Sequence, residues 1–333
     1  MTNEMTSIAA AAGLGTELVQ DAYDLVVRAA LHEIPCARSI VDSRPGNPAM
    51  RGSSITLEKI NFYTKADVVA AAAGLDEETD VDATRAPAPT PVVVTPEEYG
   101  FAALRTRKLN ARSFAAVDPI IAMQIAQHEA ETIDYLVQVA LKTGTSVVQA
   151  NNAVGNTVTA TDSGDLTATN LLGAKDVRRI VAQLRANKAI PFFGKFYGLL
   201  AHPYTILDLR EESGPGSWRE PNVYGGDQSD IWTGEIGEFE GVRVLQNALV
   251  DVALGGVGTL IPTFQNYFFG KGAVVEQVYE EPHVVVAPVV DTFNRFHKIG
   301  WYGDLGWSIY ENKALFRVES AASLDAGLDL GSS

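Results

Sequence analysis

The sequence predicts an α+β protein with projecting segments, and three observations lead to this prediction. Residues 118–144 (DPIIAMQIAQHEAETIDYLVQVALKTG) have the pattern of one long amphipathic helix. Two β-prone stretches flank a long insertion within residues 53–112. The run from about Val285 to Ser320 places aromatic residues at alternating positions, which is typical of long strands.

The bulk composition narrows the class of protein. The 333 residues are enough for one large domain or two, and 46% hydrophobic with 20% charged residues is ordinary for a globular chain. A net charge of −15 argues against a sequence-independent nucleic-acid binder, which needs Lys and Arg to neutralise phosphates. The single cysteine, Cys36, excludes an intrachain disulfide and reads as a small buried residue. We find no signal-peptide pattern and no apolar run near the ~20 residues of a membrane span, so we expect a soluble protein made in the cytoplasm.

Residues 1–52 are predicted to form an N-terminal arm. A short helix is expected over residues 16–31, where apolar residues recur at helical spacing. The following stretch, IPCARSIVDSRPGNPAMRG, is interrupted by prolines and glycines and has too little periodicity for a core of its own. We therefore expect it to lie extended on another surface.

Residues 53–112 are predicted to form a long two-stranded flap. SSITLEKINFY and TPVVVTPEEYGFAAL are β-prone, and the stretch between them is far longer than a hairpin turn requires. Pro87, Pro89, Pro91 and Pro96 mark the return strand as an edge or an extended arm. A disordered linker is the alternative.

The helix at 118–144 has recognisable ends and an apolar seam. Asp118 is expected as the N-cap with Pro119 at the first helical position, and Lys142 and Gly144 supply the stop. The predicted seam consists of Met123, Ala126, Ala130, Ile133, Val137 and Ala140. At 1.5 Å per residue the helix is roughly 36 Å long, which suits a subunit that spans distance and contacts neighbours.

A second amphipathic helix is predicted within residues 171–190, followed by a buried strand and a short helix over 195–212. Its inward residues are predicted to be Leu171, Leu172, Val177, Ile180, Val181 and Leu184, and its outward residues Lys175, Arg178, Arg179, Arg185 and Lys188. The basic row is a solvated face, a surface for an acidic neighbouring subunit or, as the least favoured alternative, a contact for nucleic acid.

The sequence predicts no catalytic residue, no metal site and no cofactor. His128-Glu129-Ala130-Glu131-Thr132 starts like a zinc-protease helix, but Thr132 stands where the second histidine must be. The acids of residues 76–82 alternate as in a calcium loop, yet Val81 replaces the turn glycine. The glycine-rich run at 254–261 matches neither a phosphate loop nor a dinucleotide fingerprint and is predicted to be a turn.

Charged residues around the flap are candidates for contacts between subunits. Arg105, Arg107, Lys108 and Arg112 are predicted at the base of the flap, because a flap that lies on a neighbour needs a fixed root. Asp76, Glu77 and Glu78 form its acidic tip.

The order of these segments resembles the major capsid proteins of tailed bacteriophages, which have the Hong Kong 97-type fold. The resemblance rests on VVVTPEEYGFAALRTRKLNA in the flap, HEAETIDYLVQVALKTGT in the long helix, FYGLLAHPYTILDLREE, WTGEIGEFEGVRVLQN and the closing DTFNRFHKIGWYGDLGWSIYENKALFRVESA. It covers essentially the whole chain, and it is carried by the number and order of these stretches.

The resemblance implies a role for each part of the chain, in which the N-terminal arm and the extended loop reach over adjacent subunits. The expected parts are an N-terminal arm (1–52), an extended β-hairpin loop (53–112), a peripheral domain with a long spine helix (113–170), an axial domain (171–282), peripheral return strands (283–320) and a mobile tail (321–333). It also implies pentamers and hexamers that close into an icosahedral shell around double-stranded DNA in the virion, assembled in the bacterial cytoplasm. A bacterial encapsulin-type compartment and a soluble α+β enzyme are the alternatives.

Two features depart from many members of that family. The arm starts within a few residues of Met1, so scaffolding is expected from a separate protein or from a region already removed; a portal and decoration proteins are further expected partners. Some members link a flap lysine covalently to a neighbour's asparagine, and Lys59 and Lys65 are candidates by position.

Overall fold

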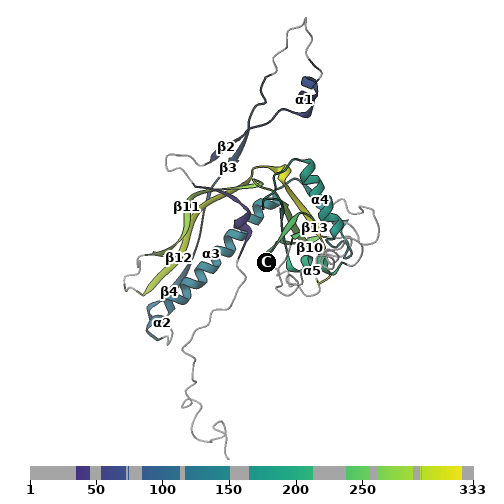
Figure 1. Cartoon of the computed structure of the whole chain (residues 1–333). Coiled ribbons are helices and arrows are strands. Elements are labelled where there is room, and N and C mark those ends of the chain that lie inside the picture. Colours follow the sequence, from purple (N-terminus) through teal and green to yellow (C-terminus); the bar gives the residue numbers. More distant parts are fainter. Residues whose placement is uncertain are drawn as a thin grey trace, which may run out of the picture.

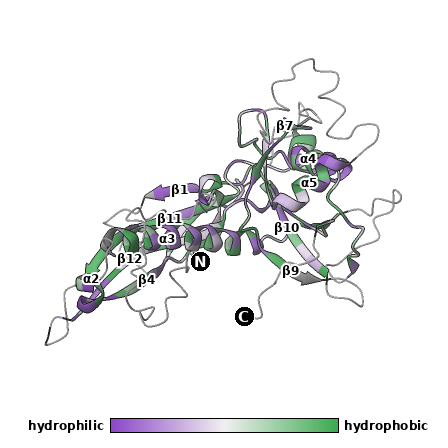
Figure 2. Cartoon of the chain, turned by 90° about the horizontal axis from the view of Figure 1, so that it is seen from below, coloured by the Kyte–Doolittle hydropathy of each residue, from purple (hydrophilic) through white to green (hydrophobic). Residues whose placement is uncertain are grey.

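The computed structural model describes residues 35–45, 54–72, 74, 85–112, 117–150, 165–212, 238–255, 261–287, 293 and 295–324. These residues form two lobes that lie side by side (Figure 2), with a hairpin projecting from one end (Figure 1). Each lobe combines a β-sheet with helices, so the predicted α+β class is confirmed. The predicted helix at 16–31 and the acidic residues Asp76, Glu77 and Glu78 lie outside the described residues.

The first lobe is a four-stranded sheet with the long helix α3 across one face (Figure 1). Its strands, in spatial order, are β1 (Asp42–Pro45), β11 (Val274–Ala287), β12 (Phe296–Ile309) and β4 (Glu97–Thr106). β1 runs parallel to β11, and the other neighbours are antiparallel. Helix α2 (Arg107–Arg112) follows β4, and α3 covers Val117–Lys142.

Helix α3 confirms the long predicted helix, but its buried stripe differs from the predicted seam. Ile133 and Val137 are buried as expected, whereas Met123 and Ala126 are exposed. Ile125 takes their place because it packs against Ile299 and Trp301 of β12. The buried apolar residues, Ile125, Ile133, Val137 and Leu141, are therefore spaced in multiples of four, and they are joined by two buried polar residues, Asp134 and Gln138. The side chains of residues 117–119 are not described, so the Asp118 cap stays a prediction.

The second lobe is a seven-stranded sheet. Its strands, in spatial order, are β5 (Val147–Gln149), β13 (Leu315–Ser320), β10 (Ile261–Phe269), β6 (Tyr197–Ala201), β8 (Val242–Gln246) and β7 (Glu238–Phe239), and β9 (Val252–Gly255) also pairs with β10. Helices α4 (Ala174–Ala186) and α5 (Pro203–Glu211) pack on one face through a shared apolar core. The opposite face packs on the C-terminal half of α3, which joins the lobes.

The local predictions in this lobe hold with small shifts. The predicted strand and short helix at 195–212 correspond to β6 and α5, and the imidazole of His202 caps α5 by accepting a hydrogen bond from the backbone of Tyr204. On α4 the four central inward residues are buried: Val177, Ile180, Val181 and Leu184. Leu171 is only half-buried because it precedes the helix and forms a β-bridge with Ala321.

Strand pairing divides the chain differently from the predicted ranges at several places: β4, from the predicted loop 53–112, joins the four-stranded sheet, and β5, from the predicted range 113–170, joins the seven-stranded sheet. β11 continues through the predicted boundary at 282/283 and pairs with β12 along its whole length. The chain passes Pro282 there because a register irregularity between Glu280 and His283 removes that residue from the ladder. β13, which the range 283–320 groups with β12, instead pairs with β10 and β5 in the other sheet.

Candidate assembly surfaces

The projecting hairpin consists of two short strands and one small helix. β2 (Ile55–Lys59) pairs antiparallel with β3 (Thr90–Val94), and α1 (Lys65–Ala72) lies beyond them. Figure 1 shows this unit extending away from both sheets. The two predicted flap strands therefore pair, although the return strand ends at Val94, since β4 belongs to the four-stranded sheet.

The far part of the hairpin presents apolar side chains to solvent. Phe62 is 88% exposed and Ile60 is 74% exposed, and Tyr63, Val68 and Val69 are also largely exposed. None of the eight residues of α1, all of them described, is buried. A helix this short is marginal in water without packing. The hairpin thus carries an apolar surface that its own chain leaves uncovered over the described residues.

The root of the hairpin is fixed to its own chain. Ile55 and Val94 are buried there. The ammonium of Lys59 forms an ion pair of 2.5 Å with Glu311, which precedes the last strand. Lys59, predicted as a contact or crosslink between subunits, therefore finds a carboxylate within the chain, while Lys65 is exposed at the start of α1. The hairpin is therefore anchored at its root, while its apolar side chains beyond Lys59 are exposed.

A second feature is the strap, which we define as residues 35–45. It contains the 3-10 helix η3 (Ala37–Ile40) and the edge strand β1, whose four residues pair with residues 275–278 of β11. Ala37 and Ile40 are buried in the apolar cluster between the lobes, together with residues of α3, β10 and β11. The strap is thus part of the junction within its own chain, and the expectation that the arm reaches over adjacent subunits is wrong for residues 35–45.

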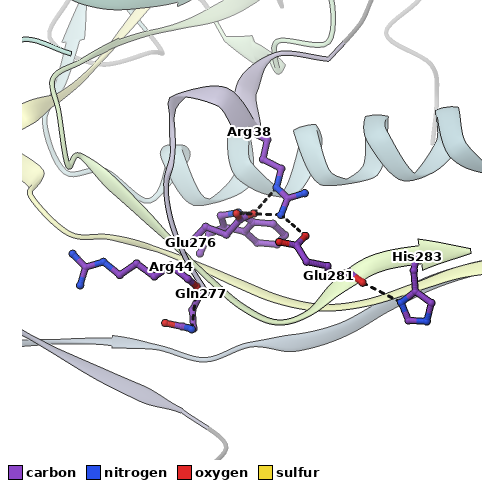
Figure 3. Close-up of polar contacts among 7 residues, drawn as sticks. Arg38, Arg44, Glu276, Gln277, Glu281 and His283 are labelled. Carbon is purple, nitrogen blue, oxygen red and sulfur yellow. Dashed lines mark hydrogen bonds and ion pairs between the residues drawn. The ribbon is translucent and has the colours of Figure 1, made fainter. Parts of the chain in front are cut away.

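Arg38 joins the strap to a buried carboxylate (Figure 3). Its Nε lies 2.9 Å from Oε1 of Glu276, and its Nη2 lies 3.3 Å from Oε2 of the same residue and 3.0 Å from Glu281. The Glu276 side chain is 0% exposed and also accepts a hydrogen bond from the Trp307 indole at 3.1 Å. Burial alone would lower the pKa of Arg38, but its bonds to Glu276 and Glu281 outweigh that effect and raise it.

Asp134 is a second polar junction, on the buried face of α3. One carboxylate oxygen accepts from the backbone N–H of Ala37 at 2.6 Å. The other accepts from the amide of Asn247 at 2.7 Å and from Gln138 at 2.8 Å. Asn247 follows β8, so this buried carboxylate ties the strap, the long helix and the seven-stranded lobe to one point.

Arg38, Asp134 and Glu276 were not among the residues predicted from the sequence. Asp134 and Glu276 had a detectable signal, because a charged residue inside an apolar pattern must find a partner when it is buried. Glu276 interrupts the run AVVEQV, and Asp134 follows Ile133 on the buried side of the helix. The partners were unpredictable because they lie about a hundred or more positions away in the sequence.

The basic residues predicted at the base of the flap lie elsewhere, and this prediction is corrected. Arg105 is near the end of the ten-residue strand β4, and Arg107, Lys108 and Arg112 are exposed on α2. At ~3.3 Å per residue, β4 carries them roughly 30 Å from the hairpin root. Figure 1 places α2 at the opposite end of the lobe. Sequence proximity to the flap was misleading because β4 is a ten-residue strand of the four-stranded sheet and separates these residues from the hairpin.

The basic row on α4 is partly used within the chain. Arg178 forms an ion pair with Glu240 at 3.1 Å. The guanidinium of Arg185 lies over the turn at Gly241, where a Cβ would be 3.1 Å from its Nη2. Arg179 is half-buried, and Lys175 and Lys188 are exposed. This row therefore supports the turn before β8 in addition to facing solvent.

An acidic row crosses the four-stranded sheet. Glu98, Asp304 and Glu280 lie directly opposite one another on β4, β12 and β11. Partial burial raises the pKa of Asp304, and the charges of Glu98 and Glu280 add to this. Like charges in register destabilise a sheet pair, so this row costs the isolated subunit stability.

The described part of the chain was compared with two kinds of site, metal centres and membrane-spanning helices. Among those residues no group of three or more His, Cys, Asp or Glu side chains is arranged to hold a metal ion. The described helices include none that is long and apolar enough to cross a bilayer.

Comparison with solved structures identifies the fold. The cyanophage Pam1 capsid matches 95% of this chain and 100% of its own at a TM-score of 0.72 and 12% identity. The capsid of Helicobacter pylori bacteriophage KHP30 matches 96% and 99% at a TM-score of 0.67 and 12% identity. The Ralstonia phage GP4 capsid matches 93% and 97% at a TM-score of 0.67 and 11% identity. This chain has the phage capsid fold. No family model and no curated protein matches the sequence.

The capsid fold spans both lobes, because each match covers more than nine-tenths of both chains. The predicted Hong Kong 97-type class is thereby confirmed at the level of fold. At 11–12% identity the likeness lies in backbone architecture, and the surfaces described above are this chain's own.

Proposed function

We propose that this protein is a major capsid protein, whose copies form pentamers and hexamers and close into an icosahedral shell around double-stranded DNA. The observation that carries the proposal is the anchored hairpin with an uncovered apolar end, in a chain that has the phage capsid fold over nearly its whole length. The role is structural and not enzymatic.

The exposed apolar side chains of the hairpin favour contact with another molecule. Each square ångström removed from water contributes about 25 cal/mol, so covering several side chains of the size of Phe62 and Ile60 is favourable. A second copy of the chain supplies the cover if the hairpin reaches over it. Each contact is modest, but in a closed shell every subunit both gives and receives such contacts, and effective concentration multiplies weak affinities.

The other parts of the chain receive roles within this proposal. The four-stranded lobe with α3 is the peripheral domain, and the seven-stranded lobe is the axial domain near the symmetry axes. The exposed basic residues of α2 and α4 and the acidic row at Asp304 are candidate contacts between neighbours. A net charge of −15 keeps packaged DNA from adhering to the wall. A scaffolding protein, a portal and decoration proteins are further proposed partners, and the finished protein resides in the virion after assembly in the bacterial cytoplasm.

The test shortens the hairpin without disturbing its root. Residues 60–89 are replaced by Asn-Gly, which closes a two-residue turn directly between the paired Lys59 and Thr90. We expect a folded subunit that sediments as monomers or small capsomers, while the unaltered protein forms closed shells under the electron microscope. Normal shells from the shortened chain would contradict the proposal. Shells that hold protein cargo and exclude DNA in the native host would favour a bacterial compartment instead.

A further inference from the structure

We propose that the strap, residues 35–45, is a charge-latched lock between the two lobes: docked, it fixes their relative orientation, and released, it frees them to rotate. Its biological use rests on the proposed capsid function, but the lock is a property of the single chain.

The position of the strap is the first argument. Ala37 and Ile40 are buried in the cluster that also holds Val137 of α3 and residues of β10 and β11. Cys36 donates from its Sγ to the carbonyl oxygen of Gln246, at the end of β8, at 3.4 Å. The first residues of the strap thus contact the long helix and both sheets at once, which is where a wedge must lie to set an angle between lobes.

The charges of the strap are the second argument. Arg38 is 35% exposed while its partner Glu276 is fully buried, so release of the strap removes the cation from a buried carboxylate. A buried ion pair adds little net stability compared with apolar residues of similar size, yet removal of one partner is costly. Such a pair suits a latch, because it specifies one docked position and penalises partial opening.

Asp134 extends the lock to the second lobe. It holds Ala37 of the strap and Asn247 of the seven-stranded lobe on its two carboxylate oxygens. Asn247 in turn accepts from the backbone of Leu249 at 2.8 Å, and Gln138 accepts from the backbone of Asp251 at 3.0 Å. Undocking the strap therefore removes one side of a network whose other side is the segment 247–251.

The edge strand explains why the strap has two discrete states. β1 contributes only four residue pairs at the edge of β11, which is too short a strand to hold by itself. Its docking depends on the apolar wedge and the charge latch together, so these contacts form or break as a unit. In a shell built from pentamers and hexamers, a subunit that undocks its strap can adopt a different angle between lobes.

Cys36 provides a direct measurement, because it is the single cysteine and lies in the strap. The unassembled full-length protein is reacted with 4,4′-dithiodipyridine, and the labelling rate is divided by that of a small free thiol. We expect slow labelling in the unaltered protein and at least a tenfold increase in Arg38→Met. The double variant Arg38→Met/Glu276→Met should return to within about threefold of the unaltered rate, because no buried charge is left alone.

The control is Arg44→Met, which changes an arginine of the same strap whose ion pair, with Asp42 at 3.7 Å, lies at the surface. Its labelling rate should match that of the unaltered protein. If Arg38→Met does not fold, Arg38→Lys keeps the charge but loses the two-point contact, and a severalfold increase is expected. Equal labelling in the Arg38 variant and the unaltered protein would overturn the latch.

The lock between lobes needs its own readout. Hydrogen exchange at residues 247–251 should accelerate in Arg38→Met together with Cys36 labelling. Exposure of Cys36 with unchanged exchange at 247–251 would show a strap that opens without freeing the lobes, and would overturn the lock. Because the protein is unassembled in both measurements, neither result depends on whether it forms shells.

Discussion

The strap and the hairpin are successive segments of the chain, yet their side chains meet opposite environments. The strap carries a charged side chain, Arg38, and buries its partner completely within the same chain. The hairpin carries apolar side chains such as Phe62 and leaves them in water. The strap pairs a buried charge within the same chain. The hairpin leaves apolar side chains exposed, and their burial by another molecule would be favourable.

This difference separates contacts that fold the subunit from contacts that remain for other copies. Burial of a charge is tolerated only with a partner at fixed geometry, so the strap is part of the folded subunit. An exposed apolar surface on a projecting segment marks a site for another molecule. Substitutions in the strap should therefore change unfolding, and substitutions in the hairpin should change assembly.

The largest effect on unfolding is expected from Asp134→Ala. It leaves the buried donors of Ala37, Gln138 and Asn247 without their acceptor, at a cost of about 3–5 kcal/mol in the free energy of unfolding. The measurement is urea unfolding of the unassembled subunit.

The matched control for that substitution lies in the hairpin. Asp67→Ala removes a carboxylate that caps α1 through Thr64 at 2.7 Å. We expect fraying of α1 and no change in the main unfolding transition. If both variants lose the same free energy of unfolding, contacts of the strap and of the hairpin do not differ in their contribution to the folded subunit.

The pH dependence of unfolding tests the seven-stranded lobe, where His202 caps helix α5. Burial lowers the pKa of His202 to about 4, from an ordinary value of 6.5. The unfolded chain therefore binds this proton first, and stability is lost as the pH falls from 6.5 towards 4, by at most about 3 kcal/mol. His202→Asn keeps a cap that does not titrate, so its unfolding free energy should depend less on pH across that window. If the unfolding free energies of His202→Asn and the unaltered protein depend on pH in the same way, His202 is not the group that causes the loss of stability.

Lys59 at the hairpin root should have a small effect. Its ion pair with Glu311 is about three-quarters buried on both sides, and Lys59→Met should cost about 1 kcal/mol or less in unfolding. Shell formation should survive, because the root contact is internal. If Lys59→Met forms no shells while its unfolding free energy is unchanged, Lys59 contacts a neighbouring subunit after all.

The smallest effect on unfolding is expected from Phe62→Ser. A side chain 88% exposed contributes almost nothing to the folded monomer, so its unfolding free energy should change by less than about 0.5 kcal/mol. Assembly should fail or need a higher protein concentration, as light scattering would show. Phe62→Leu keeps the apolar contact and should assemble, which distinguishes lost burial from a nonspecific defect.

The sequence predicted local elements well and long-range pairing poorly. Helix α3, helix α4 and the strand β6 were recognisable because their burial follows a local period. The placement of β13 beside β10 was not, since nothing near Leu315 encodes which sheet it joins.

The candidate contact residues were likewise predicted where they depend on local sequence and missed where they depend on long-range pairing. The hairpin was predicted from its β-prone flanks and prolines, whereas the basic residues beyond it were misplaced because β4 carries them away from its root. The pairing of Arg38 with Glu276 could be found only through the fold, since 238 positions separate the two residues.

Hydrogen exchange on free subunits and on closed shells tests the central claim most directly. Residues 65–72 of α1 should exchange rapidly in the free subunit and become protected in the shell. Residues 37–45 of the strap should already be protected in the free subunit, because their partners lie in the same chain. Equal exchange of α1 in both states would contradict the claim that the hairpin is completed by another copy.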